Sequence, residues 1–321
     1  MVKISLKNIF VAIFITIFSW GCSLFKTIEF ETADGLYIEQ LGYKVKSLDD
    51  NKKILVSSGN DTMEMTVNRR IALFNGTKIW MYFPLTRDQY GDLRIRKVDF
   101  EKIINPLFSR NMMQKTPVKR IVIDAGHGNE DAGAIGKFSK EKDLNLSLSL
   151  KIKKSLEAKC FEVIMTRDSD IFLTLDARSE FAEKNNADLF LCIHHNAAAG
   201  VKTAHGIETY SLTAADNAGT HDKGKNVTAT HERKGNKFDT QNVILNHLVQ
   251  SKIIADTKAF DRGSKFARYK VLVLAPCPAI LLEAGFVSNP KEEVTINSPE
   301  YQDKIASAVA EAVAEFANIK Q

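Results

Sequence analysis

The stretch IVIDAGHG at residues 121–128 joins a short apolar run to a turn bracketed by glycines. The run has the length and the β-branched composition of a buried strand. Gly126 and Gly128 stand on either side of His127 and predict a tight turn directly after that strand. Open α/β sheets bind ligands at the carboxyl ends of their strands. The stretch therefore predicts an α/β domain with a site at one edge of its sheet.

Two further apolar runs end in polar residues in the same way. The run LFLCI ends at His194, the run AILL ends at Glu283, and Glu141 begins the helical stretch that follows the first turn. Because the carboxyl ends of strands meet at one edge of an open α/β sheet, we expect His127, Glu141, His194 and Glu283 to converge there.

Strand-like and helix-like segments alternate from residue 119 onward. Residues 143–160 carry leucine or isoleucine at every fourth position, which predicts the apolar face of a helix. The pattern predicts strands at 121–124, 161–167, 187–193, 206–210, 271–274 and 279–283, and helices at 143–160, 175–185, 241–258 and after Ser298-Pro299. We expect residues 206–210 near the sheet edge. The alternation predicts a three-layer α/β fold, in which a twisted, mostly parallel sheet has helices on both faces.

Residues 27–113 differ in texture and predict a small α+β accessory domain. Asn75-Gly76 lies between two apolar runs and is a strong hairpin signal, and residues 99–108 predict a short helix. No cluster of histidine, cysteine or carboxylate residues occurs in this part of the sequence. We therefore divide the chain into an export signal at 1–22, the accessory domain at 27–113 and a catalytic domain at 118–321.

The composition is that of an ordinary globular protein, with 321 residues, 44% hydrophobic and 26% charged. The net charge of +5 and the pI of about 8.8 suit a polyanionic envelope or a membrane surface. No dense stripe of lysine and arginine with interleaved aromatic residues is present, which argues against nucleic acid as a partner.

The N-terminus has the shape of a secretory signal. Lys3 and Lys7 precede the apolar run 9–18, which is too short to span a bilayer. Gly21-Cys22 resembles a bacterial lipoprotein cleavage site, where Cys22 would become the lipid-modified first residue. An ordinary cleaved signal and an uncleaved anchor are the alternatives. We expect export to the periplasm or cell envelope, with a membrane anchor at Cys22.

The four polar residues at the element ends favour a metallohydrolase. Two imidazoles and one carboxylate form a three-ligand zinc site with an open position. The second carboxylate is then left over as a base that can take a proton from water.

Several ordered motifs within residues 118–320 resemble those of the zinc-dependent N-acetylmuramoyl-L-alanine amidases of bacterial cell walls, the type-3 amidase family. The motifs are IVIDAGHG with DAGA at 131–134, EKDLNL at 141–146, CIHHNA at 192–197 and LEAGFVSN at 282–289. The resemblance implies that His127, Glu141 and His194 bind one Zn²⁺ per catalytic domain. It also implies that Glu283 is the catalytic carboxylate and that peptidoglycan is the partner. Residues 27–113 more loosely resemble copper-amine-oxidase N-terminal-like domains, a name that implies neither copper nor oxidase activity.

Some residues around the motif positions have more than one candidate role. Neighbours in a strand point to opposite faces, so His194 and His195 cannot both bind one metal, and the motif register selects His194. His195 and Asn196 are candidates for substrate contacts, and the alternative for His195 is a histidine at the surface or in a second layer behind the site. Asp124 either orients His127 or is a turn residue at the strand end.

Three functions remain open from the sequence. The leading one is an exported amidase that cleaves the bond between N-acetylmuramic acid and the L-alanine of the stem peptide. Another exported zinc hydrolase of peptidoglycan, a peptidase or a deacetylase, would use the same chemistry. A non-catalytic wall-binding lipoprotein is the third. The accessory domain could have a protein partner. The polar segment 212–238 has no apolar stripe that could cover the metal, so we expect an open site.

Overall fold

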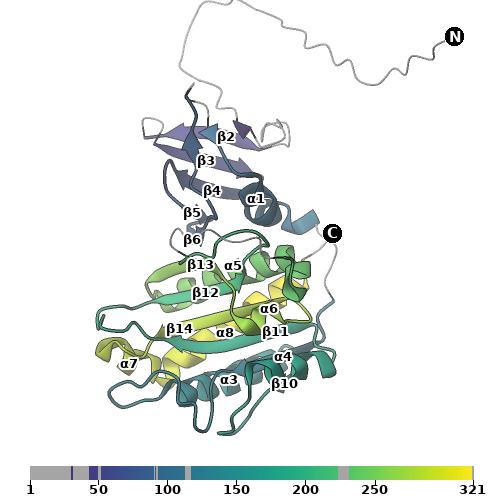
Figure 1. Ribbon diagram of the computed structural model, residues 1–321, viewed down its shortest axis with the longest axis vertical. Helices are drawn as coiled ribbons and strands as arrows, with labels where there is room; N and C mark the ends of the chain where they lie inside the picture. Colours follow the sequence, from purple (N-terminus) through teal and green to yellow (C-terminus); the bar gives the residue numbers. More distant parts are fainter. Residues whose placement is uncertain are drawn as a thin grey trace, which may run out of the picture.

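An eleven-stranded sheet runs through both predicted domains of the computed structural model (Figure 1). The structure describes residues 30–31, 43–49, 52–89, 91, 93–112, 117–222 and 231–319. The predicted export signal and Cys22 lie outside these residues. None of the described helices is long and apolar enough to cross a membrane. The strands follow one another across the sheet in the order β10 (Glu162–Met165), β9 (Arg120–Ala125), β11 (Leu189–Asn196), β14 (Ala279–Phe286), β12 (Ile207–Leu212), β13 (Asp261–Ala267), β6 (Thr77–Trp80), β5 (Ile71–Phe74), β4 (Asp61–Thr66), β3 (Lys53–Ser58) and β2 (Lys44–Leu48).

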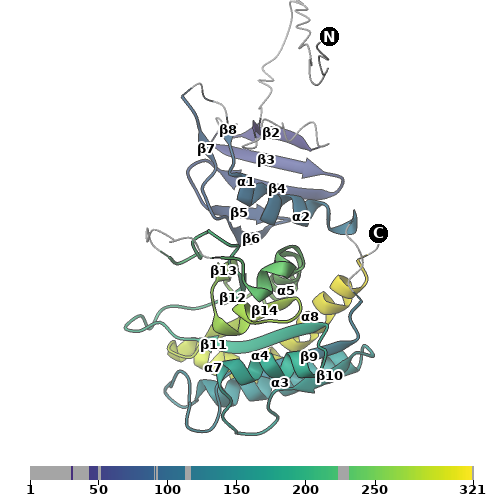
Figure 2. The ribbon, with the colours of Figure 1, turned by 45° about the vertical axis from the view of Figure 1, so that its right-hand side comes forward.

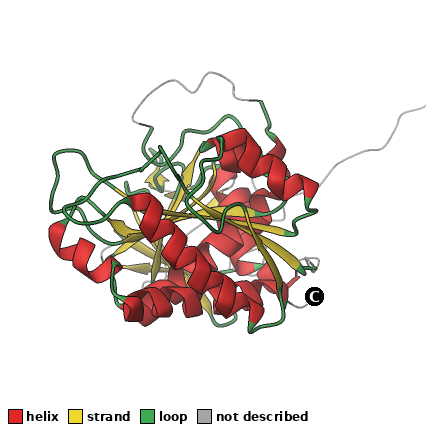
Figure 3. Cartoon of the chain, turned by 90° about the horizontal axis from the view of Figure 1, so that it is seen from below, coloured by secondary structure: helices red, strands yellow, loops and turns green. Residues whose placement is uncertain are grey.

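The strands from β10 to β13 form the catalytic half of the sheet. Neighbouring strands are parallel except for the antiparallel pair β12 and β14. Helices lie on both faces of this half (Figure 3). One face packs against α3 (Glu141–Glu157), α5 (Asp239–Thr257) and α8 (Pro299–Ala317), and the other against α4 (Leu175–Lys184) and α6 (Lys270–Val273). The predicted three-layer, mostly parallel fold with a small preceding domain is confirmed.

Side-chain alternation along the strands explains the two layers of core. In β9, Ile121 and Ile123 join the large core under α3, α5 and α8, whereas Val122 joins the smaller core under α4 and α6. Successive strand residues point to opposite faces, so a strand buried on both sides must be apolar throughout. The apolar run at residues 121–123 meets that requirement.

The accessory half of the sheet is an antiparallel meander from β2 to β6, with one helical segment against it (Figure 2). Asn75 and Gly76 both have positive φ, of 49° and 84°, and form the predicted tight hairpin between β5 and β6. The helical segment consists of α1 (Lys97–Asp99), the π-helix η2 (Phe100–Ile104), α2 (Asn105–Phe108) and the 3₁₀ turn η3 (Arg110–Met112). A small second sheet contains β1 (Phe30–Glu31), β8 (Leu93–Arg94) and β7 (Thr86–Arg87).

Two local predictions were wrong. Residues 271–274 were predicted as a strand, but residues 271–273 belong to α6, because a short apolar run fits a buried helix as well as a strand. Of residues 206–210, predicted near the sheet edge, 207–210 belong to β12, which lies inside the eleven-stranded sheet. The polar strand β13 covers it, and β6 of the accessory half then pairs with β13. The remaining elements are the 3₁₀ helix η4 (Lys234–Phe238) and α7 (Pro290–Ile296).

Candidate active site

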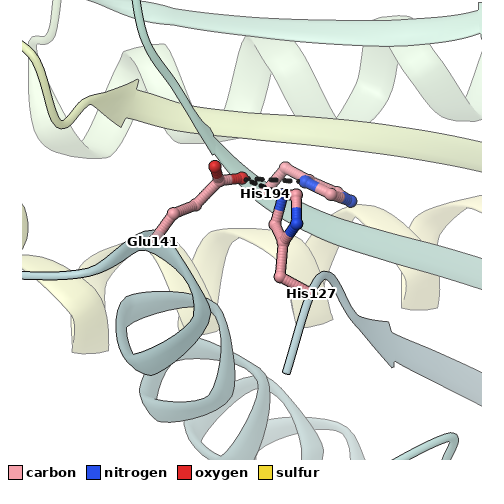
Figure 4. A group of neighbouring side chains, drawn as sticks. All are labelled: His127, Glu141 and His194. Atoms are coloured by element: carbon pink, nitrogen blue, oxygen red, sulfur yellow. Dashed lines mark hydrogen bonds and ion pairs between the residues drawn. The ribbon is translucent and has the colours of Figure 1, made fainter. Parts of the chain in front are cut away.

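Three residues predicted as metal ligands converge beyond the strand ends (Figure 4). His127 lies in the turn after β9, Glu141 is the first residue of α3, and His194 lies near the end of β11. Glu141 Oε1 is 3.1 Å from His127 Nε2 and 2.9 Å from His194 Nδ1. One ligand atom from each residue lies within 4.8 Å of the other two. Two imidazole nitrogens and a carboxylate oxygen are a donor set that suits zinc.

Two glycines allow these side chains to approach so closely. A Cβ atom added to Gly126 would lie 2.3 Å from the His194 ring, and one added to Gly133 would lie 2.6 Å from Glu141 Oε2. His127 itself has a φ of 62°, in the left-handed region that non-glycine residues seldom adopt. The turn therefore holds a strained histidine between glycines that leave room for the other two ligands.

Asp131 orients His127, a role that the sequence did not assign to it. Asp131 Oδ2 lies 2.8 Å from His127 Nδ1. A carboxylate on Nδ1 fixes the ring orientation and leaves Nε2 facing Glu141. The available signal was a carboxylate four residues after the turn histidine, within the DAGA motif.

Asp124, the predicted candidate for orienting His127, has other partners. It is fully buried and accepts hydrogen bonds from Thr166 Oγ1 at 2.6 Å, Arg178 Nη1 at 2.8 Å and Cys192 Sγ at 3.1 Å. Arg178 Nη2 also donates to the carbonyl oxygen of His127 at 2.9 Å. Asp124 thus reaches His127 through Arg178 and the backbone of the turn, whereas the direct contact comes from Asp131.

The pKa values of Glu141 and His127 depend on each other. Burial raises the pKa of Glu141, but hydrogen bonds from His127 and His194 outweigh burial and hold that pKa far below its ordinary value. Burial lowers the pKa of His127, but Glu141 and Asp131 outweigh it and raise that pKa. A firmly ionised carboxylate between two imidazoles is a strong attraction for a cation.

Glu283 lies on the strand next to His194, at the same level of the sheet. The Glu283 side chain is partly exposed, but its Oε2 atom is shielded and has no hydrogen-bond partner among the described residues. Burial raises the pKa of Glu283 well above its ordinary value, and the nearby Glu141 and Glu208 raise it further. A buried polar atom without a partner, beside a metal-type cluster, marks a group available for chemistry.

A cavity of about 370 Å³ brings the polar groups together. His127, Asp131, His194 and Glu283 all line it. The apolar part of its wall comes mainly from Phe172, Leu173, Leu175, Tyr269, Val271 and Leu281. A mostly apolar cavity with a few convergent polar groups is typical of a ligand site. A larger cavity of about 690 Å³, lined by residues that include Lys202, Phe260 and Tyr301, contains none of the predicted site residues.

Glu208 occupies the strand beside Glu283 and gathers four donors. It is 2% exposed and is the register partner of Glu283 across β12 and β14. Asn196 Nδ2 donates to it at 2.7 Å, the Tyr210 hydroxyl at 2.8 Å and Arg262 Nε at 2.6 Å, and the Lys265 ammonium group forms a buried ion pair with it. Asn196, predicted to contact substrate, is therefore tied to Glu208 in this structure.

His195 points away from the cavity. It is 1% exposed, and its Nδ1 lies 2.8 Å from Asn145 Oδ1 on α3. Burial lowers the pKa of His195 to about 4, so the ring is neutral at physiological pH. These contacts favour a second-layer position for His195 over the substrate role and over a place at the surface.

The comparisons with known proteins agree with this geometry. The family model described as N-acetylmuramoyl-L-alanine amidase matches residues 121–315, and the one described as Copper amine oxidase N-terminal domain matches residues 36–89. AmiA of Escherichia coli (strain K12) is 29% identical over 231 residues, which cover 65% of this chain and 80% of AmiA.

Two solved structures share the fold of the catalytic half. An N-acetylmuramoyl-L-alanine amidase from Clostridium difficile 630 has a TM-score of 0.51 at 32% identity, over 62% of this chain and 96% of that chain. The catalytic domain of the amidase CwlV from Bacillus (Paenibacillus) polymyxa var. colistinus has a TM-score of 0.53 at 30% identity, over 63% of this chain and 100% of that chain. The family match, which spans more than half of the residues, shows that this chain belongs to the type-3 N-acetylmuramoyl-L-alanine amidase family.

Proposed function

We propose that this protein is a zinc-dependent hydrolase of peptidoglycan that cleaves the amide bond between N-acetylmuramic acid and the L-alanine of the stem peptide. The observation that carries the proposal is the cavity in which Glu283, with an unpartnered carboxylate oxygen, faces the His127, Glu141 and His194 cluster. Membership of the amidase family supports the choice of bond.

The residues of the cluster fit a zinc ion. Their donor atoms are close enough to share one ion, and Gly126 and Gly133 leave the space that the ring and the carboxylate need. His127, Glu141 and His194 would hold the metal, and Asp131 would fix the His127 ring. Zinc would act there as a Lewis acid that polarises the substrate carbonyl and makes water acidic enough to be deprotonated near neutral pH.

Glu283 is the proton carrier in this proposal. Its carboxylate takes a proton from the attacking water and delivers it to the nitrogen of the departing L-alanine. Burial and the neighbouring negative charges of Glu141 and Glu208 raise the pKa of Glu283, which makes it a stronger base than an exposed glutamate.

We also propose that the enzyme is exported to the cell envelope, on the basis of residues 1–22 and the lipoprotein-like Gly21-Cys22. Lipid attachment at Cys22 and a protein partner for residues 27–113 stay predictions. The open site stays a prediction as well. The exposure of the His127 and His194 side chains, 24% and 20%, supports it.

Mass spectrometry of purified peptidoglycan digested with residues 27–321 tests the proposal, with and without a zinc chelator. Peptides that begin at L-alanine, together with glycan strands free of peptide, should appear only without chelator. Cleavage between amino acids of the stem, or loss of acetyl groups, would identify another hydrolase. An intact wall in both samples, despite bound zinc, would contradict catalysis by this chain alone.

A further inference from the structure

The accessory domain reaches the catalytic site through the shared sheet. Four adjacent strands each carry one side chain of a continuous row: Glu283 on β14, Glu208 on β12, Lys265 on β13 and Trp80 on β6. Glu208 is the register partner of Glu283 and is ion-paired with Lys265. The Lys265 ammonium group lies 5.8 Å from the centre of the Trp80 ring, within the range of a cation–π contact. The row therefore starts at the proposed proton carrier and ends in the other domain.

The contacts at the domain boundary fix the start of β13. Ile79 of β6 pairs with Ser264 of β13. The Trp80 indole N–H donates to the carbonyl oxygen of Arg262 at 3.1 Å. The Lys78 amide donates to Asp261 Oδ2, and the Lys78 ammonium group donates to the Asp261 carbonyl oxygen, both at 2.8 Å. The accessory domain thus holds residues 261–264 by both backbone and side chains.

Arg262, which is held in this way, and Lys265, which contacts the Trp80 ring, neutralise Glu208. Arg262 and Lys265 supply both positive charges that pair with this carboxylate. A buried carboxylate that loses a charged partner is destabilised strongly, because the remaining charge is left unpaired. Glu208 also anchors Asn196, two residues beyond His194, and lies beside Glu283. A shift of β13 would therefore disturb a proposed zinc ligand and the proposed proton carrier together.

We propose that Trp80 is a positioning residue for catalysis and that the accessory domain is part of the catalytic unit. The inference rests on the proposed amidase function. It differs from a wall-binding role for the accessory domain, in which residues 27–113 would concentrate the enzyme on its polymer. A wall-binding domain affects turnover of the intact wall alone, whereas a positioning residue affects every substrate that Glu283 acts on.

Full-chain variants and two substrates distinguish these roles. Trp80→Phe removes the indole N–H donor and keeps an aromatic ring, and Trp80→Ala removes both. Lys102→Ala is the matched control, because it breaks another contact across the domain boundary, the 2.9 Å ion pair with Asp239, the first residue of α5. The kcat and KM of each protein are measured on a soluble muropeptide and on intact sacculi, per mole of bound zinc, and hydrogen exchange is followed in peptides from 205–212 and 261–267.

Trp80→Ala should lower kcat about tenfold on both substrates, with KM within about twofold, as expected for the loss of one hydrogen bond and its ring contact. Trp80→Phe should lower kcat about threefold on both substrates. Both variants should exchange faster in the two strands, and Lys102→Ala should match the wild type in kcat and in exchange there.

Three results would overturn the inference. Unchanged kcat and exchange in both Trp80 variants would remove Trp80 from the positioning role. A loss confined to sacculi would assign the domain to wall binding instead. Equal losses in Lys102→Ala would indicate general destabilisation. A zinc-loaded wild type that cleaves neither substrate would overturn the proposed function itself, which is a separate result from active wild type with unaffected variants.

Discussion

The two halves of the eleven-stranded sheet differ in strand direction and in the length of the chain that connects their strands. In the catalytic half, β9, β11 and β14 are parallel neighbours, and each is separated from the next by a long stretch of chain. In the accessory half, β2 to β6 are antiparallel and joined by short turns. Parallel strands end at a common edge, so residues 127, 194 and 283 meet there. A meander brings together only residues that are already close in sequence.

Each half also contains a shielded carboxylate, and the two carboxylates differ in their hydrogen-bond partners. Asp99 in the accessory half is fully buried and accepts hydrogen bonds from the amides of Tyr82 at 2.6 Å and Phe83 at 3.1 Å. Glu283 in the catalytic half has an oxygen with no partner among the described residues. Asp99 is therefore satisfied by the fold, whereas the free oxygen of Glu283 is consistent with the proposed role as proton carrier.

Of the replacements predicted here, that of Glu283 should have the largest effect, which is a loss of kcat. Glu283→Gln keeps the shape of the side chain but removes its ability to accept and return a proton. We expect kcat to fall about 10³-fold, with zinc content unchanged because Glu283 is not part of the ligand cluster. The measurement is the rate of release of stem peptides from a soluble muropeptide, beside zinc analysis of the same sample. Turnover close to that of the wild type would exclude Glu283 as the proton carrier.

Replacement of Asp131 should weaken the metal site without removing a ligand. Asp131→Asn loses the charged contact with His127 Nδ1, so zinc affinity should fall about 10- to 100-fold. Competition with a chromogenic chelator measures the affinity. Glu130→Gln changes the exposed neighbouring carboxylate and is the control. An equal loss of affinity in both variants would point to long-range charge and not to orientation of the ring.

Asp99 should make the stability of the protein depend on pH. Burial raises the pKa of Asp99 to about 7, against 3.8 for an ordinary aspartate. Between these values the folded protein keeps a proton that the unfolded chain has lost, so the free energy of unfolding falls as pH rises from about 4 to about 7. The contribution is about 4 kcal/mol at most.

Urea unfolding of the wild type and of Asp99→Asn at several pH values isolates the contribution of Asp99 to the free energy of unfolding. The difference between the two proteins should change across that pH range and level off above it. A difference that stays constant from pH 4 to 8 would show that Asp99 is ionised in the folded protein throughout.

The smallest expected effect is on stability and concerns α4, the helix that connects β10 to β11. Thr174 caps α4, because its hydroxyl oxygen accepts a hydrogen bond from the amide of Ala177 at 3.2 Å. Thr174→Ala should lower the free energy of unfolding by ~1 kcal/mol, and Thr174→Ser should restore most of it. Chemical denaturation measures both. Equal stability of all three proteins would mean that packing alone holds the start of α4.

The sequence predicted the metal-type cluster well because His127, Glu141 and His194 lie at the ends of strongly patterned elements. The polar strand β13 gave no apolar signal, so neither its position nor its pairing with β6 could be predicted. Ile79 and Ser264 are remote in sequence, and only the folded sheet brings them together. The direct contact of Asp131 with His127 likewise depends on the path of a turn with a left-handed histidine, which spacing alone does not specify.

The pairing of β6 with β13 also bears on how copies of this protein avoid one another. Without β6, β13 would be an edge strand, with one row of backbone donors and acceptors free to pair with another chain. The accessory domain pairs with this row at Ser264 and continues the sheet to β2. A catalytic domain that begins at residue 118 would therefore be more prone to self-association. Shielding this edge of the sheet is a second role of the accessory domain.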